Sequence, residues 1–237
     1  MKNSTKEIIN EINTYRDESK AAFLPRFFKT GKGEYGEGDQ FIGVVVPNLR
    51  IVAKKHFEAD FDTLRELLAS PYHEYRLTAL LALTYRYAKL KDHASRETCV
   101  NFYVSQVDSI NNWDLVDLSC YKILGHWLFD KDKQLLYDWA KENHLWKQRI
   151  AMISCMHFVK QGEFKDALAI ADLLQHHPHD LIHKAVGWIL REIGKEDEQL
   201  LVDYLTPRYK EMPRTMLRYA IERFEEGKRK AFLNSTI

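Results

Sequence analysis

The sequence predicts an all-helical protein. Apolar residues recur at helical spacing along most of the 237-residue chain, as Leu77, Leu80 and Leu81 illustrate. The sequence contains no long run of alternating apolar and polar residues, the pattern typical of half-buried strands. Ser70-Pro71 reads as an N-cap followed by a proline in the first helical turn, and three more prolines stand where helices would begin: Pro47, Pro178 and Pro213. We therefore expect about a dozen short helices.

The helices are expected to form pairs. From residue 60 onward the pattern indicates pairs over roughly 60–90, 92–129, 131–161, 163–194 and 197–232. The second helices begin near Arg76, Asp117, Arg149 and Lys184, at steps of 41, 32 and 35 residues. Such periods fit HEAT-like repeats, which stack into a superhelix, an α-α solenoid with a concave face. We expect one domain over 1–237, with N-terminal helices in 1–59 and paired-helix repeats in 60–237.

The composition indicates a globular protein with balanced charge. Hydrophobic residues make up 45% of the chain, which is enough for a substantial core. Because 35 Lys and Arg face 34 Asp and Glu, nucleic-acid binding would depend on a local basic face. The three cysteines form no CxxC pair, and the N-terminal segment lacks the apolar core of a signal peptide. We therefore expect a cytoplasmic protein with reduced cysteines. Because the sequence has no long apolar run, we expect no membrane-spanning helix.

One irregular stretch, residues 31–40, interrupts the predicted helices. Its glycines match the GxGxxG pattern of phosphate-binding loops. The preceding segment reads as helix rather than strand, so the match is weak and phosphate binding is not expected. We expect a loop between two helices, followed by an extended segment over 41–46 that ends at Pro47.

The starts of the second helices suggest a shared site. In a stack of helical pairs, equivalent positions line one concave wall. Arg76, Arg149 and Lys184 would then form a row of cations in which Asp117 is the single carboxylate. In the last pair the row would continue with Arg214 or Arg218.

Two tryptophans are expected beside this row. Trp113 precedes Asp117 by four residues, so both should occupy one helical face. A later helix repeats the pattern with Lys184, Trp188 and Arg191. Two plainer interpretations stay open: the tryptophans are core aromatics between helix layers, and Asp117 is a surface ion-pair partner of Arg149.

Three blocks of the sequence resemble a known family. Residues 112–117 (NWDLVD), 146–149 (WKQR) and 184–192 (KAVGWILRE) look like the WDxVD, WxQR and KAxGWxLRE blocks of AlkD-type alkylpurine DNA glycosylases. The blocks occur in the family's order with similar separation, and the resemblance extends loosely over nearly the whole chain. Three linked blocks are far more specific than one.

This resemblance implies a function and a set of roles. It implies a HEAT-like superhelix that holds duplex DNA in a concave groove and excises cationic N3- or N7-alkylated purines in base excision repair, without further strand cleavage. By motif, Trp113 and Trp188 would contact the damaged nucleotide and its backbone, Asp117 would be the catalytic carboxylate, and Arg149 would bind a phosphate. The resemblance implies a monomer with no metal, no organic cofactor and no obligate protein partner.

The residue types suit this chemistry. An alkylated purine already carries positive charge, so it leaves as a neutral base and needs no general acid. A carboxylate beside the sugar favours the developing oxocarbenium-like charge or orients the attacking water. Indole faces attract a cationic nucleotide by about 0.5–2 kcal/mol. Selectivity for charged lesions would follow.

Further cations are expected to neutralise DNA phosphates and give salt-sensitive binding without sequence preference. The candidates are Arg76, Lys147, Lys184, Arg191, Arg214 and Arg218. Phe27 stands where the family often has tyrosine, and it keeps the stacking face but lacks the hydroxyl. When bound to DNA, the protein would associate with the nucleoid.

Two other functions remain open at this stage. A catalytically inactive DNA-structure binder would use the same basic groove without releasing a base. A protein-interaction scaffold would use the repeat surface and have no salt-dependent DNA affinity. The histidines of residues 176–179 are expected in a polar loop rather than a metal site, because Pro178 breaks helical spacing.

Overall fold

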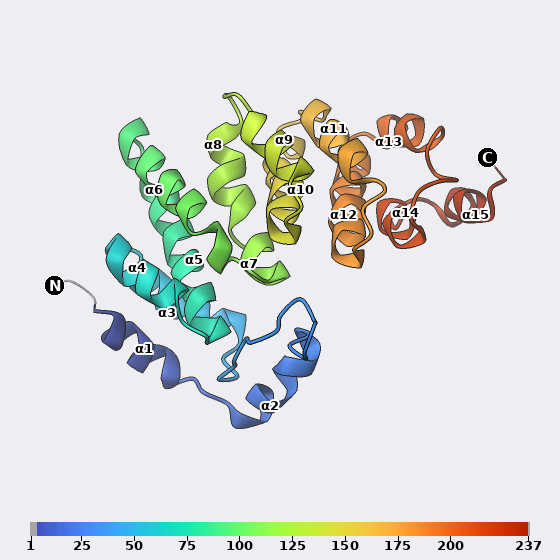
Figure 1. The fold of residues 1–237 in the computed structure, drawn as a ribbon. Helices are drawn as coiled ribbons and strands as arrows, with labels where there is room; N and C mark the ends of the chain where they lie inside the picture. The colour runs from blue at the N-terminus through green and yellow to red at the C-terminus, as the bar shows by residue number, and fades with distance from the viewer. Residues whose placement is uncertain (1–3, 237) are drawn as a thin grey trace. The chain divides into compact units, whose positions relative to one another are not determined.

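The computed structural model describes residues 4–236 and contains helices, turns and loops but no strand over that range (Figure 1). The predicted all-helical fold is confirmed. The chain divides into two compact units, Met1–Ile123 and Leu124–Ile237, which are described separately below.

The helices of the first unit are short apart from one. They are α1 (Thr5–Asn13), α2 (Glu18–Phe27), α3 (Val46–Lys55), α4 (Phe61–Leu68), α5 (His73–Lys89), α6 (His93–Ser105), the 3-10 turn Val107–Ser109 and α7 (Trp113–Asp117). Helix α5 is central, since α3, α4, α6 and α7 all contact it and 13 of its 17 residues are buried. Any polar residue in its first turns must therefore find a partner inside the unit.

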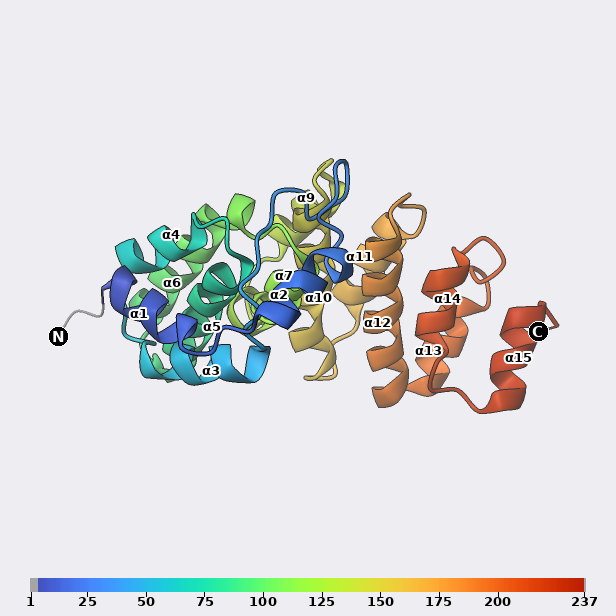
Figure 2. The same ribbon diagram turned by 90° about the horizontal axis from the view of Figure 1, so that it is seen from below.

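The helices of the second unit begin after a π-helical turn at Tyr121–Gly125. They are α8 (His126–Leu128), α9 (Gln134–Lys141), α10 (Leu145–Val159), α11 (Lys165–Leu174), α12 (Asp180–Glu196), α13 (Glu198–Leu205), α14 (Arg214–Ala220) and α15 (Glu226–Asn234). Figures 1 and 2 show α10 and α12 side by side, and α12 also contacts α11, α13 and α14. Each expected pair range contains at least two helices, and the range 92–129 spans the division between the units.

Side-chain caps explain many of the helix starts. Asp60, Asp92 and Asp197 each accept a hydrogen bond from the backbone N–H three residues on, at 2.8–2.9 Å. Pro47 lies in the first turn of α3, as expected. These local signals are readable from the sequence because they involve residues within one turn of each other.

The expected start of α5 was wrong. Ser70-Pro71 was predicted to cap the helix, but α5 begins at His73. Gln40 pairs with this segment: its N–H donates to the Pro71 carbonyl and its carbonyl accepts from the His73 N–H, each at 2.9 Å. Because a segment 30 residues away bonds the backbone here, Pro71 and Tyr72 are held outside the helix.

The predicted loop and extended segment lie between α2 and α3. The N–H groups of Gly31 and Gly33 donate to the carboxylates of Glu34 and Glu37, each at 2.8 Å. Two N–H groups of the GxGxxG match are therefore already bonded to carboxylates of the loop itself, and a bound phosphate would face these negative charges. This favours a structural loop over a phosphate site.

The extended segment 41–45 is held by Glu74 at the start of α5. Its carboxylate accepts the backbone N–H groups of Ile42, Gly43 and Val44 at 2.8–3.3 Å. Gly43 has φ +82°, and a Cβ there would lie 1.9 Å from the Asp17 carbonyl oxygen. Only glycine fits this position, where the end of the α1–α2 connection passes close by.

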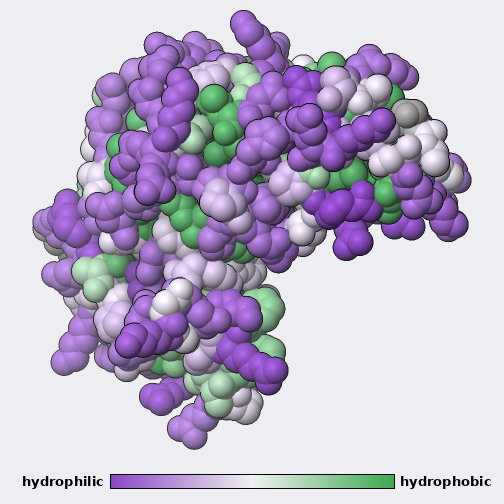
Figure 3. Space-filling model, turned by 45° about the vertical axis from the view of Figure 1, so that its right-hand side comes forward, coloured by the Kyte–Doolittle hydropathy of each residue, from purple (hydrophilic) through white to green (hydrophobic). Residues whose placement is uncertain are grey.

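The view in Figure 3 shows a face dominated by hydrophilic side chains, with hydrophobic ones in small groups. Larger apolar residues are exposed in a few places, including Phe23 (61%) and Phe27 (51%) on α2. Helix α2 has no buried residue, although it contains two phenylalanines, a leucine and two alanines. Its two phenylalanines instead contact aromatic rings, Phe23 that of Phe27 and Phe27 that of Trp113.

Candidate functional site

In the first unit, the candidate site is built on the short helix α7. Trp113 and Asp117 are its first and last residues, and both are half-buried. The three residues between them, Asp114, Leu115 and Val116, are buried. The four-residue spacing therefore places the indole and the carboxylate on the helical face that the unit leaves partly open, as the sequence predicts.

Two phenylalanines support the Trp113 ring. Phe28 stacks on it, with ring centroids 5.4 Å apart and an interplanar angle of 19°. Phe27 meets it edge-on, at 5.9 Å and 70°. Phe23 stacks on Phe27 at 6.2 Å, which extends the aromatic group into solvent. Phe27 was predicted, whereas Phe23 was missed although its spacing of four residues from Phe27 was a readable signal.

A buried polar network lies beneath the aromatic group. Asp39 accepts hydrogen bonds from Arg76 at 2.6 Å and from the side-chain amide of Asn112 at 3.3 Å. The His73 ring places Nε2 2.8 Å from an Asp114 carboxylate oxygen and Nδ1 3.4 Å from an Asp39 oxygen. All five residues are at most 8% exposed. We call Asp39, His73, Arg76, Asn112 and Asp114 the buried network.

The charges of this network depend on each other. Burial alone would lower the pKa of His73, but the charge of Asp114 and the hydrogen bonds to Asp114 and Asp39 outweigh it, and they raise the pKa to about 9. Burial alone would raise the pKa of Asp39, but the His73 hydrogen bond and the Arg76 charge hold that pKa below its ordinary value. At neutral pH, His73 is therefore an imidazolium that donates to both carboxylates.

Arg76 corrects a prediction. It was expected to contact DNA from a concave wall, but it is 5% exposed and its guanidinium bonds Asp39 and the Ser70 carbonyl. The reason is that Asp39, 37 residues away in the sequence, needs a cation when it is buried. His73, Asp39 and Asp114 were missed as site residues, and their only signal was Asp114 inside the NWDLVD block.

In the second unit, α12 presents a stripe of the predicted residues. Lys184, Trp188 and Arg191 are all half-buried, while Ala185, Val186, Gly187, Ile189 and Leu190 around them are buried. Lys184 pairs with Asp180 at 2.7 Å, and Arg191 pairs with Glu192 at 3.4 Å and with Glu222. Neither Trp113 nor Trp188 is fully buried.

Arg149 lies between two helices of the second unit. It is 4% exposed, and its Nη1 donates to the Leu181 carbonyl in the first turn of α12 at 2.5 Å. This contact fixes α10 against α12. This burial counts against the predicted phosphate contact of Arg149, as it does for Arg76.

The other predicted cations of the second unit are more accessible. Lys147 pairs with Glu142 at 2.7 Å, and its side chain is 21% exposed. Arg214 and Arg218 are exposed on α14, where Arg214 donates to the Leu233 carbonyl at 3.0 Å. A surface ion pair such as Lys147–Glu142 contributes little to stability, so Lys147 can exchange its partner for a phosphate at small cost.

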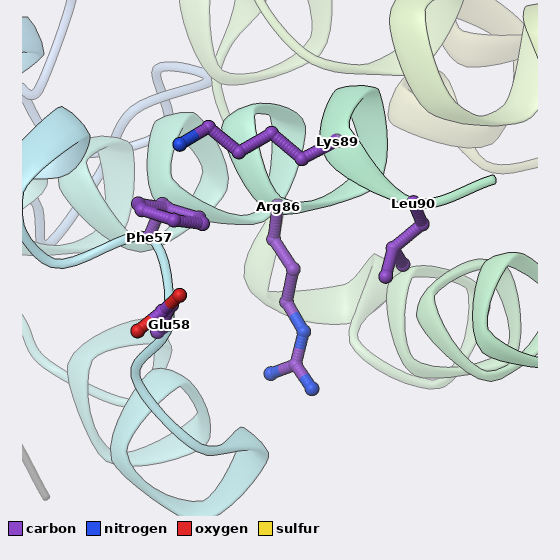
Figure 4. A pocket seen from close by; sticks show the side chains of 5 residues that line it. All are labelled: Phe57, Glu58, Arg86, Lys89 and Leu90. Atoms are coloured by element: carbon purple, nitrogen blue, oxygen red, sulfur yellow. The ribbon is translucent and has the colours of Figure 1, made fainter.

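A pocket of about 410 Å³ opens elsewhere in the first unit, lined by Phe57, Glu58, Arg86, Lys89 and Leu90 (Figure 4). Lys89 lies over the Phe57 ring, with Nζ 3.7 Å from the ring centroid. Arg86 donates to the Ala59 carbonyl at 3.1 Å. None of the residues predicted for the functional site lines this pocket.

The comparisons with known proteins agree on one family. The family model described as DNA alkylation repair enzyme matches residues 8–224. Among solved structures, a predicted DNA alkylation repair enzyme from Enterococcus faecalis is 14% identical, with a TM-score of 0.68 over 89% of this chain and 97% of that chain. AlkD2 from Streptococcus mutans is 16% identical, with a TM-score of 0.54 over 88% of this chain and 99% of that chain. These structural likenesses show the shared helical-repeat fold.

A search of curated proteins gives no match. Within residues 4–236, the helices are all too short or too polar to cross a lipid bilayer. The family match covers most of the chain, including all three sequence blocks with Trp113 and Trp188. The chain therefore belongs to the DNA alkylation repair enzyme family.

Proposed function

We propose that this DNA alkylation repair protein is a monofunctional glycosylase, which hydrolyses the N-glycosidic bond of cationic N3- or N7-alkylated purines in duplex DNA. It would act as a monomer on DNA in the cytoplasm, as the first step of base excision repair. The observation that carries the proposal is the pairing of Trp113 and Asp117 at the two ends of α7, on its partly open face.

The chemistry needs little beyond these two groups. The lesion leaves as a neutral base, so the protein has to stabilise positive charge on the sugar and hold the nucleotide. The Asp117 carboxylate supplies the negative charge for the oxocarbenium-like transition state or orients the attacking water. The indole of Trp113, backed by Phe28, supplies an aromatic surface for a cationic nucleotide.

The second unit would contribute contacts to the nucleotide and to the DNA backbone. The α12 stripe offers Trp188 with a cation on either side, Lys184 and Arg191. The family resemblance supports Trp188 as a contact to the damaged nucleotide. The remaining proposed phosphate contacts are Lys147, Arg214 and Arg218. Each phosphate contact removed should weaken binding at all sequences and reduce its salt dependence.

The test is base release from duplex DNA that contains N7-methylguanine or N3-methyladenine. The wild-type protein should release the modified base, and Asp117→Asn should lower the single-turnover rate by about 100-fold, with DNA affinity nearly unchanged. The matched control is Asp62→Asn, because the Asp62 side chain on α4 is 88% exposed and belongs to the same unit. This control should leave the rate unchanged.

The outcomes separate the open functions. Absence of base release by the folded wild-type protein above background refutes the glycosylase proposal. Salt-dependent binding of duplex or branched DNA without release would instead support a non-catalytic DNA-structure binder. A folded protein with no salt-dependent DNA affinity would support the interpretation as a protein-interaction scaffold.

A further inference from the structure

We propose that His73 is a positioning residue, which holds α7 in place through Asp114 and Asp39 and so fixes Trp113 and Asp117 for the reaction. The consequence for catalysis rests on the glycosylase function proposed above. The structural part of the proposal, that His73 fixes Trp113, stands on contacts within the first unit alone.

Helix α7 needs support from outside itself. It has five residues, and isolated helices shorter than about 12 residues are marginal in water. Its two functional side chains are at its ends, so fraying of either end would displace one of them. The buried residues between them, especially Asp114, are therefore the points at which the unit can hold the helix.

His73 reaches α7 by two routes. The direct route is the 2.8 Å contact between Nε2 and the Asp114 carboxylate. The second route runs through Asp39, which accepts a hydrogen bond from Nδ2 of Asn112, while the side-chain oxygen Oδ1 of Asn112 accepts the Trp113 backbone N–H at 2.8 Å. Asn112 is the N-cap of α7 and Asp114 its second residue, so two positions in the first turn of the helix are tied to one imidazole.

The same imidazole supports the tryptophan through an aromatic contact. The His73 and Phe28 ring centroids are 4.7 Å apart, and Phe28 stacks on Trp113. Phe41 adds a second stacked ring against His73, at 5.0 Å. A displaced imidazole would therefore disturb the Trp113 ring through Phe28 as well as through the backbone of α7.

The two routes operate together only when both ring nitrogens carry a proton. A neutral imidazole has one N–H, and it can donate to Asp114 or to Asp39 but not to both. The charged groups around the ring are Asp39, Asp114 and Arg76. Glu74, the next residue of α5, is bonded to the backbone of residues 42–44. Deprotonation of His73 would release one of the two ties.

The experiment follows Trp113 directly in the full-length chain. Tryptophan is replaced by 5-fluorotryptophan, and Trp113→Phe assigns the fluorine resonance of position 113 among the five tryptophans. In His73→Gln, the amide can keep only part of the bonding, so the resonance of position 113 should shift or broaden. In the wild-type protein it should change along a titration with its midpoint near pH 9, and His73→Gln should lack this alkaline change.

The matched control is His56→Gln. His56 is also buried in the first unit, at 3% exposure, but its Nε2 lies 2.7 Å from the carboxylate of Glu11, which is on α1 rather than α7. Its substitution should leave the resonance of position 113 unchanged. A second variant, Asp114→Asn, keeps an oxygen acceptor but removes the charge, and it should shift the resonance in the same way. This variant tests the proposal even if His73→Gln does not fold.

Base release then tests the catalytic consequence. His73→Gln should lower kcat by about tenfold or more with a small change in KM, because a misplaced carboxylate acts on the reacting state rather than on DNA binding. An unchanged resonance of position 113 in folded His73→Gln and Asp114→Asn overturns the proposal. If the wild-type protein releases no base, the glycosylase proposal fails, while the fluorine data still decide whether His73 fixes Trp113.

Discussion

The buried network should make the stability of the first unit depend on alkaline pH. His73 titrates at about 9 in the folded protein, against 6.5 for its ordinary value. A group whose folded pKa is raised contributes stability that is complete below the unfolded pKa and is lost as the pH rises through the folded pKa. The contribution of His73 should therefore be complete below pH 6.5 and gone above about pH 9.

The magnitude follows from the size of the shift. Each unit of pKa difference corresponds to about 1.4 kcal/mol, so a rise from 6.5 to about 9 corresponds to about 3 kcal/mol of unfolding free energy. Asp39 acts in the opposite direction, because its pKa is lowered. Its contribution is present above its ordinary pKa and is lost as the pH falls through the lowered value.

The assay is urea unfolding at a series of pH values from 6 to 10. Unfolding is monitored by the fluorine resonance of 5-fluorotryptophan at position 113, which reports on the folding of the first unit. The difference in unfolding free energy between the wild type and His73→Gln should shrink by about 3 kcal/mol across this range. His56→Gln is the control and should retain the alkaline loss. Parallel pH profiles of wild type and His73→Gln would show that the imidazolium does not stabilise the unit.

Three further predictions concern other contacts. Glu74→Ala should destabilise the first unit by roughly 3 kcal/mol or more in urea unfolding, since three buried N–H groups lose their acceptor; Glu74→Gln should cost less, and equal costs would contradict this account. Gly187→Ala should destabilise the second unit by about 1–3 kcal/mol, because the new Cβ would lie 2.5 Å from the Met216 carbonyl oxygen; thermal unfolding unchanged from wild type would refute it. Phe23→Ala should weaken duplex DNA binding about threefold or more with stability kept within about 0.5 kcal/mol, whereas Leu173→Ala, which also removes an exposed apolar side chain, should not weaken it.

Much of the candidate site was readable because it depends on local spacing. Trp113 and Asp117 are four residues apart, and one turn of helix is enough to bring them onto the same face. Lys184, Trp188 and Arg191 follow the same rule on α12. Phe27 was found through its place in the family pattern, and the structure sets it edge-on against Trp113.

The errors arose where partners are distant in the sequence. Arg76 looked like one more cation at the start of a repeat, but Asp39 and the Ser70 carbonyl bury and bind it. Ser70-Pro71 looked like a cap, but pairing with Gln40 delays the start of α5 to His73. A pattern of apolar and polar residues does not distinguish an exposed charge from a buried charge that has a partner.

The sequence by itself determined most of the helices and the face of α7 that carries Trp113 and Asp117. These features follow from the 3.6-residue period and from caps within single turns, which are local properties of the chain. Only the tertiary structure decided that Arg76 and Arg149 are buried, and that His73 joins Asp39 to Asp114. Those contacts bring together residues 32 to 41 positions apart, and burial leaves each charge stable only beside its particular partner.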